Sequence, residues 1–140
     1  MAADIFRPSR KGAAAVLGPL EGKVMEVIWR TGGAVAVPEV HRAVNGRRGT
    51  LSYSAVKAVL NNLAAKGHLA KSRQGKVTHF EAMRSREEFD ARVIATVVGS
   101  LKRNFGTPMI AQLVDELAVD DETLREFERV IAAKKAEMKS

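Results

Sequence analysis

The stretch Ser52–Gly67 (SYSAVKAVLNNLAAKG) carries hydrogen-bonding side chains at a spacing that would place them on one face of a helix. Its apolar residues recur at i, i+3, i+4 and i+7, the spacing of a buried stripe: Val56, Val59, Leu60 and Leu63. The opposite face would carry Tyr53, Ser54, Lys57, Ala58 and Asn61. This face has one cation, no acid, and several hydroxyl and amide groups, unlike an ordinary solvated helix surface. It is therefore suited to hydrogen bonding with a partner.

Residues that commonly carry catalysis or bind metals are sparse and scattered. The three histidines are His41, His68 and His79, and no cysteine or acidic cluster accompanies them. This spacing provides no set of side chains that could coordinate a metal ion or activate a nucleophile, so we expect no enzyme activity, no metal and no cofactor. We expect His41 and His79 to face solvent or phosphate. The lack of cysteine fits a reducing cytoplasm, and no apolar run reaches the ~18 residues of a membrane span.

Positive charge is concentrated in the first part of the chain. The 140 residues have a net charge of +7, and residues 1–82 hold 13 Lys and Arg against 5 Asp and Glu. Residues 83–140 hold 10 against 11. This asymmetry is typical of a polyanion-binding module joined to a neutral one, although charge alone is equally compatible with a protein that is merely basic. We interpret residues 1–17 as a flexible basic arm.

Local signals predict three helices and a hairpin before residue 83. Helix ends are indicated at Gly32-Gly33, Asn45-Gly46 and Gly67, with Pro38 and Ser52 at helix starts. Two short β-prone runs then flank Gln74-Gly75, which predicts a tight hairpin turn. The expected elements are helices over 20–31, 38–45 and 52–67 and strands over 69–73 and 76–80.

Three helices followed by a basic hairpin are the layout of a winged helix, here residues 18–83, with the hairpin as the wing. In this layout the third helix enters the major groove of DNA, where hydroxyl and amide groups can bond base edges. Acidic groups on that helix would be repelled by the phosphates. We therefore expect double-stranded DNA to contact Ser52, Tyr53, Ser54, Lys57, Ala58, Asn61, Arg47, Arg48, Arg73 and Lys76.

Residues 84–140 contain three further amphipathic patterns, beginning with a capping box at Ser85–Glu88. A segment this short buries apolar area poorly by itself, so we expect an intertwined homodimer rather than a self-contained bundle. A two-fold dimer would also match the two half-sites of a (pseudo)palindromic operator. The expected interface, or the bundle core supporting it, comprises Phe89, Ile94, Val98, Met109, Leu113, Leu117, Leu124, Phe127 and Ile131. The predicted fold is mainly α with a small β-hairpin: an N-terminal winged helix-turn-helix followed by a C-terminal helical dimerisation region.

The chain resembles the BlaI/MecI/CopY family of penicillinase repressors over about residues 17–133. The similarity lies in LGPLEGKVMEVIWRTG, VPEVHRAV, LSYSAVKAVLNNLAAKGHL and, more weakly, VDELAVDDETLREFERVI. The resemblance implies a dimeric repressor with an N-terminal winged helix and a C-terminal helical dimerisation region.

The third helix departs from the pattern of that family, which is close to Y-T-T-V-x-T-x-L-x-R-L. Here Ala55 and Ala58 replace two threonines and Asn62 replaces an arginine. We therefore do not assign the operator sequence of that family to this chain. Copper-sensing members of that family use C-terminal cysteines, and the absence of cysteine here argues against copper sensing through thiolates. The resemblance further implies proteolysis of an Asn-Phe bond in the middle C-terminal helix, where this chain has Gln112-Leu113; an Asn104-Phe105 pair lies one segment earlier. We therefore expect the protein to be released from DNA by a ligand, a partner or a protease with a different sequence preference. The sequence does not identify an upstream sensor.

Two classes of function remain open from the sequence. One is a sequence-specific transcriptional regulator, expected to be a cytoplasmic homodimeric repressor released by a signal. The other is a winged-helix architectural or protein-interaction module without operator specificity. The polar, nearly uncharged face of the third helix favours the first.

Overall fold

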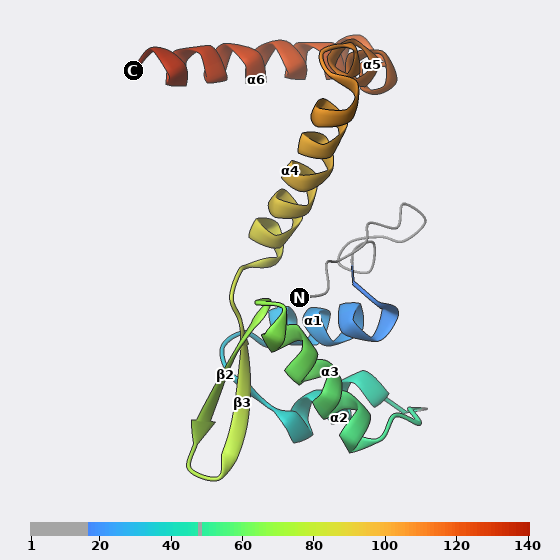
Figure 1. Cartoon of the computed structure of the whole chain (residues 1–140), viewed down its shortest axis with the longest axis vertical. Helices are drawn as coiled ribbons and strands as arrows, with labels where there is room; N and C mark the ends of the chain where they lie inside the picture. The colour runs from blue at the N-terminus through green and yellow to red at the C-terminus, as the bar shows by residue number, and fades with distance from the viewer. Residues whose placement is uncertain (1–16, 48) are drawn as a thin grey trace. The chain divides into compact units, whose positions relative to one another are not determined.

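A computed structural model describes residues 17–47 and 49–140, which divide into two compact units at Ala95/Thr96 (Figure 1). Of the arm expected for residues 1–17, only Leu17 is described, and its side chain is fully buried. Within the described ranges, no helix is both long and apolar enough to cross a membrane. The elements are α1 (Pro19–Thr31), β1 (Val35–Ala36), α2 (Val37–Asn45), α3 (Tyr53–Ala65), β2 (Leu69–Gln74), β3 (Val77–Ala82), α4 (Arg86–Phe105), α5 (Pro108–Leu117) and α6 (Asp121–Lys139).

The ends of α3 are set by local chemistry, as the sequence predicts. The Ser52 hydroxyl oxygen accepts a hydrogen bond from the Ala55 N–H at 3.1 Å and so caps the first turn. At the other end Gly67 adopts φ +87°, and the His68 N–H reaches back to the Leu63 carbonyl at 2.9 Å. This is the Schellman arrangement, which requires a left-handed residue and therefore favours glycine.

The wing is confirmed as an antiparallel hairpin of β2 and β3, joined by the two-residue turn Gly75-Lys76. Gly75 has φ +67°, the conformation that a type II′ turn requires at its first position. The short strand β1, which the sequence analysis did not predict, pairs with β3 through Val35 and Phe80. The sheet order is β1-β3-β2, so β3 is central.

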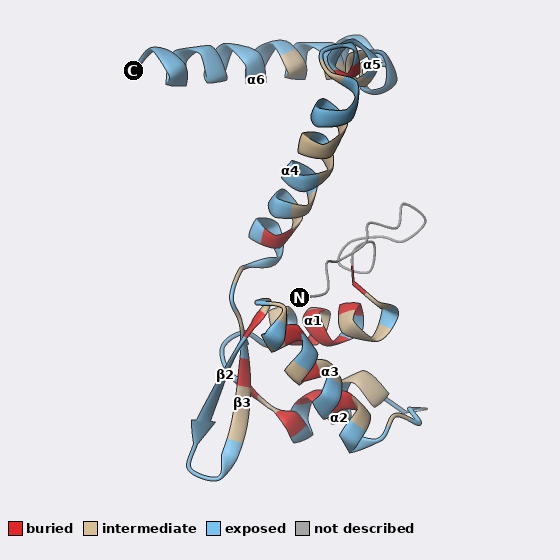
Figure 2. Ribbon diagram, viewed as in Figure 1, coloured by how far each residue is buried: buried red, intermediate tan, exposed pale blue. Residues whose placement is uncertain are grey.

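The core of the first unit lies between α1, α2, α3 and the base of the sheet, as the buried residues in Figure 2 show. The predicted stripe of α3 is confirmed: Val56, Leu60 and Leu63 are fully buried, and Val59 is half-buried. The main buried side chains are Leu17, Val24, Met25, Ile28, Val35, Val37, Val40, Val56, Leu60, Leu63, Leu69, Phe80 and Phe89.

The first turns of α4 pack within the first unit. The predicted capping box is present, because the Glu88 N–H donates to Ser85 Oγ at 3.1 Å and the Ser85 N–H donates to Glu88 Oε1 at 3.4 Å. The Phe89 ring is 4% exposed and lies 5.4 Å from the Trp29 ring, centroid to centroid. The sequence analysis expected Phe89 at a subunit interface or in the bundle core supporting it, but its ring belongs to the core of its own winged helix.

The second unit, which comprises the rest of α4 with α5 and α6, buries little apolar surface. Met109 is its one buried side chain, whereas Leu113 and Phe127 are half-buried. The Asp120 side chain caps α6 by accepting the Thr123 N–H at 2.8 Å, and this hydrogen bond lowers the pKa of Asp120. Large apolar side chains are exposed on this unit: Val98, Phe105, Ile110, Leu117, Val119, Leu124, Val130, Ile131 and Met138.

Candidate nucleic-acid interface

The outward face of α3 carries the polar side chains that the sequence predicts for DNA contact. Ser52, Tyr53, Ser54, Lys57 and Ala58 are all exposed, and Tyr53 retains 45% of its surface. No acidic residue lies in this helix. Its exposed face therefore offers hydroxyl groups, an ammonium group and the N-terminal end of a helix, all of which favour an anionic partner.

The turn before α3 is closed by the side chain of Asn45. Its Nδ2 donates to the carbonyls of His41 at 2.9 Å and Leu51 at 3.1 Å, and its Oδ1 accepts the Leu51 N–H at 2.9 Å. A Cβ atom on Gly49 would stand 2.2 Å from the Cα atom of Asn45, so the turn requires glycine at that position. These contacts fix the start of α3 against α2.

His41 supports the same junction, contrary to the expectation that it faces solvent or phosphate. Its Nε2 lies 2.8 Å from the Leu51 carbonyl oxygen, and since that oxygen can only accept, Nε2 carries the proton. The His41 ring also meets the Tyr53 ring edge-on, with centroids 5.8 Å apart. The sequence analysis missed both His41 and Asn45 as supports of the start of α3.

The wing places its cations on the face that packs against the helices. Side chains alternate along a strand, so Leu69, Lys71 and Arg73 share one face of β2. Leu69 is buried in the core, Lys71 lies at its margin, and Arg73 is exposed further out. Lys76 is exposed in the turn. The pattern forms a basic strip that continues outward from the core.

Helix α3 and the wing are joined by a contact that the sequence analysis did not predict. Lys71 Nζ donates to Asn61 Oδ1 at 2.9 Å, and it also lies 5.9 Å from the centroid of the Phe80 ring. Asn61 is half-buried, unlike the other polar residues on its face of α3. The strand alternation that places Lys71 beside Leu69 was a signal available in the sequence.

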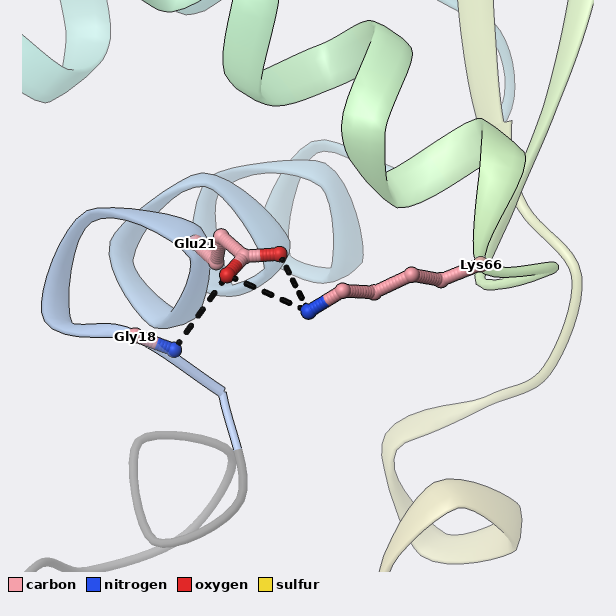
Figure 3. A network of polar contacts seen from close by, with 3 residues as sticks. All are labelled: Gly18, Glu21 and Lys66. Atoms are coloured by element: carbon pink, nitrogen blue, oxygen red, sulfur yellow. Dashed lines mark hydrogen bonds and ion pairs between the residues drawn. The ribbon is translucent and has the colours of Figure 1, made fainter. Parts of the chain in front are cut away.

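Lys66 belongs to the fold rather than to the exposed basic surface. Figure 3 shows its ammonium group against Glu21 of α1, with Nζ 3.0 Å from Oε2 and each side chain only 16% exposed. Glu21 Oε1 also accepts the Gly18 N–H at 3.4 Å, at the start of α1. The pair ties the end of α3 to α1. Of the two arginines expected before α3, Arg47 is exposed, whereas Arg48 lies outside the described residues.

The helices, the three-stranded sheet and the basic hairpin define a winged-helix protein. The family model described as penicillinase repressor matches residues 17–133. The chain belongs to this family and is a DNA-binding transcription regulator. No curated protein matches it significantly.

Several solved structures are similar at low sequence identity. RosR from H. salinarum is 17% identical, with 89% of this chain and 98% of that chain covered and a TM-score of 0.46. BpsR from Bordetella bronchiseptica, a structure concerned with regulation of DNA binding by 6-hydroxynicotinic acid, is 17% identical, with coverages of 75% and 77% and a TM-score of 0.42. A MarR family protein from Bacillus stearothermophilus is 18% identical, with coverages of 89% and 76% and a TM-score of 0.38. The assignment rests on the family match and takes no weight from these similarities.

Proposed function

We propose that the chain is a cytoplasmic, homodimeric transcriptional repressor that binds a (pseudo)palindromic operator and is released from it by a signal. The observation that carries this proposal is the exposed, acid-free face of α3, flanked by the cations of the wing. Such a face can bond base edges, while the wing cations neutralise phosphates.

The residues divide by the chemistry they offer. Tyr53, Ser54, Lys57 and Asn61 read base edges or adjacent phosphates, with Ala58 packed against the groove and Ser52 at the helix start. Arg73 and Lys76 contact phosphates from the wing, and Arg47 and Arg48 do so from the turn before α3.

The dimer is supported by the apolar surface of the second unit. Leu117 is 53% exposed, Leu124 is 41% exposed and Ile131 is 51% exposed. Large apolar side chains exposed in this number are unfavourable in water and favour association with a partner. In this proposal residues 18–83 bind DNA, while residues 84–140 provide the dimerisation region through residues other than Phe89.

The DNA proposal is tested by comparing the affinity for genomic fragments with that for random duplex at physiological salt. A specific repressor should favour its sites by ~10³-fold or more. Lys57→Ala should weaken specific binding more than random binding, whereas Lys139→Ala, which removes the same charge near the C-terminus, should not change the ratio. Equal affinity for every duplex would instead indicate an architectural module.

The dimer proposal is tested by sedimentation of the full chain at micromolar concentration. Burying a leucine stabilises by ~1.5–3 kcal/mol, and a two-fold interface contains each residue twice, so Leu117→Asp should weaken the dimer by roughly 10²- to 10⁴-fold. Val77→Asp places the same charge at an exposed apolar residue of the wing and should leave the dimer intact. A monomeric wild-type chain would refute the proposal.

The release step follows a different route from the one that the family resemblance implies. Gln112 and Leu113 lie inside α5, and helical backbone is a poor protease substrate until it unfolds. We infer release by a ligand, a partner or a protease of different preference. Mass spectrometry of the protein from cells exposed to a cell-wall antibiotic tests this. Fragments ending at Gln112 or Asn104 would contradict the inference, and an intact chain that has left its operator would support it.

A further inference from the structure

We propose that Lys71 determines base specificity indirectly, as a positioning residue for Asn61. By holding Asn61 Oδ1, Lys71 directs the N–H donors of the Asn61 amide outward, so that the base facing Asn61 must offer an acceptor. This inference rests on the proposed DNA-binding role of α3, and it adds a residue of the wing to the readout made by the helix.

Lys71 is held in place by the wing itself. It lies directly opposite Phe80 in the register of β2 and β3, and directly opposed residues of an antiparallel pair project from the same face. The Phe80 ring is 1% exposed and fixed in the core, and Lys71 Nζ lies 5.9 Å from its centroid. The ammonium group thus lies near both the Phe80 ring and the amide of Asn61.

The chemistry of the two groups sets the orientation of the amide. A lysine ammonium group only donates hydrogen bonds, so the atom of Asn61 that it meets at 2.9 Å is the oxygen. The two N–H donors of the same amide are then directed away from Lys71. Rotating the amide by half a turn would place its NH₂ group against the ammonium, with donors facing donors. Lys71 therefore excludes the flipped amide.

A fixed donor distinguishes bases that a rotating amide would not. In the major groove guanine offers O6 and N7, adenine offers N7 and thymine offers O4 as acceptors, whereas cytosine presents only the N4 donor. With Lys71 in place, Asn61 favours the acceptors and disfavours cytosine. Without Lys71, the amide can turn its oxygen outward and accept from cytosine N4.

The test is selection from a randomised operator library with the full-length protein and five variants. The wild type should disfavour cytosine at one base pair of each half-site by about tenfold, a typical value for one side-chain contact to a base edge. Lys71→Met keeps the aliphatic stem, removes the donor and should abolish this discrimination. Lys71→Arg is also donor-only and should retain it. Lys76→Met removes the same charge at the wing tip and should weaken all sequences alike.

The remaining two variants, Asn61→Ala and the double variant Asn61→Ala/Lys71→Met, separate action through Asn61 from direct contact. In an Asn61→Ala background, Lys71→Met should cause no further loss of discrimination at that base pair, because the amide that it orients is absent. Circular dichroism checks that each variant folds, and Lys71→Thr, which suits an edge strand, replaces Lys71→Met if the latter does not fold.

Two results overturn the inference, and they are distinguishable. If Lys71→Met weakens every sequence equally, as Lys76→Met should, then Lys71 contacts phosphate and orients nothing, while the repressor proposal stands. If the wild type itself enriches no sequence, the repressor proposal and this inference fall together.

Discussion

Replacing Asn45 by alanine should destabilise the winged helix far more than its position at the end of a surface helix suggests. The substitution removes three hydrogen bonds of 2.9, 3.1 and 2.9 Å that close the turn between α2 and α3. Each such bond contributes ~1 kcal/mol net. The Leu51 carbonyl keeps His41 as a partner, whereas the Leu51 N–H loses the Asn45 oxygen. We expect a loss of about 2–3 kcal/mol in the free energy of unfolding, a large share of the ~5–15 kcal/mol of a typical domain.

Urea unfolding followed by tryptophan fluorescence measures this loss in the relevant unit. Trp29 is the only tryptophan of the chain and packs against Phe89 within the first unit, so its emission reports on the winged helix alone. The midpoint should fall while the slope with urea stays unchanged, because the surface exposed on unfolding is the same. Asn45→Asp should be no better, since a carboxylate cannot donate to the two carbonyls.

Asn62→Ala provides the matched control. Asn62 is an exposed amide on α3, and its replacement should change the free energy of unfolding by no more than ~0.5 kcal/mol. The reasoning fails if Asn45→Ala and Asn62→Ala unfold at the same urea concentration. In that case the three bonds in the turn would contribute nothing beyond what water supplies.

Further perturbations separate the remaining roles. Lys66→Met should lower the free energy of unfolding by ~1–3 kcal/mol, because it leaves the partly buried Glu21 carboxylate without its cation. It should not alter the slope of log affinity for DNA against log salt, whereas Arg73→Ala should reduce that slope by about one. Gly49→Ala should cost ~1–3 kcal/mol in the same urea assay, since its Cβ would overlap Asn45. The hydrogen bond from the Thr123 N–H lowers the pKa of Asp120. The cap therefore contributes its full stability to α6 above pH ~3.9, the ordinary pKa of an aspartate, and loses it as the pH falls through the lowered pKa. Helicity measured by circular dichroism should decline in that acidic range, and Asp120→Asn, which keeps an oxygen acceptor, should reduce the decline.

The sequence was sufficient for the helices and the wing because their ends are encoded locally. Ser52 caps the first turn of α3, and Gly67 and Gly75 adopt the positive φ that the end of α3 and the hairpin turn require. Each of these boundaries therefore depends on residues within a few positions of it. Strand β1 was missed for the opposite reason. Its two residues have no periodicity to detect, and they become a strand only by pairing with His79 and Phe80, more than 40 residues later.

The supports of the site were harder to predict because each one contacts a residue outside its own helix, which no local pattern shows. Asn45 was interpreted as a helix stop, although its side chain also bonds Leu51 across the turn. Lys66 is one of the cations of the basic first part of the chain, but Glu21 of α1, 45 residues earlier, pairs with it. Phe89 illustrates a different limit. An amphipathic stripe shows that a face is covered, but it does not show whether the cover is the same chain or a second copy.

The sheet order has a consequence for solubility. Strand β2 forms an outer edge, and β1 covers β3 only at Phe80 and His79, so the outer part of the hairpin has unpaired backbone groups on both sides. Open strand edges invite pairing with other chains and hence aggregation, and charged side chains along them oppose it. Arg73 and Lys76 therefore protect the free protein from self-association through the same charges that would meet phosphates. A variant lacking both cations should aggregate at concentrations where the wild type stays dispersed. In the wild type bound to DNA, the phosphates meet these charges, and the DNA that covers the wing should itself prevent self-association.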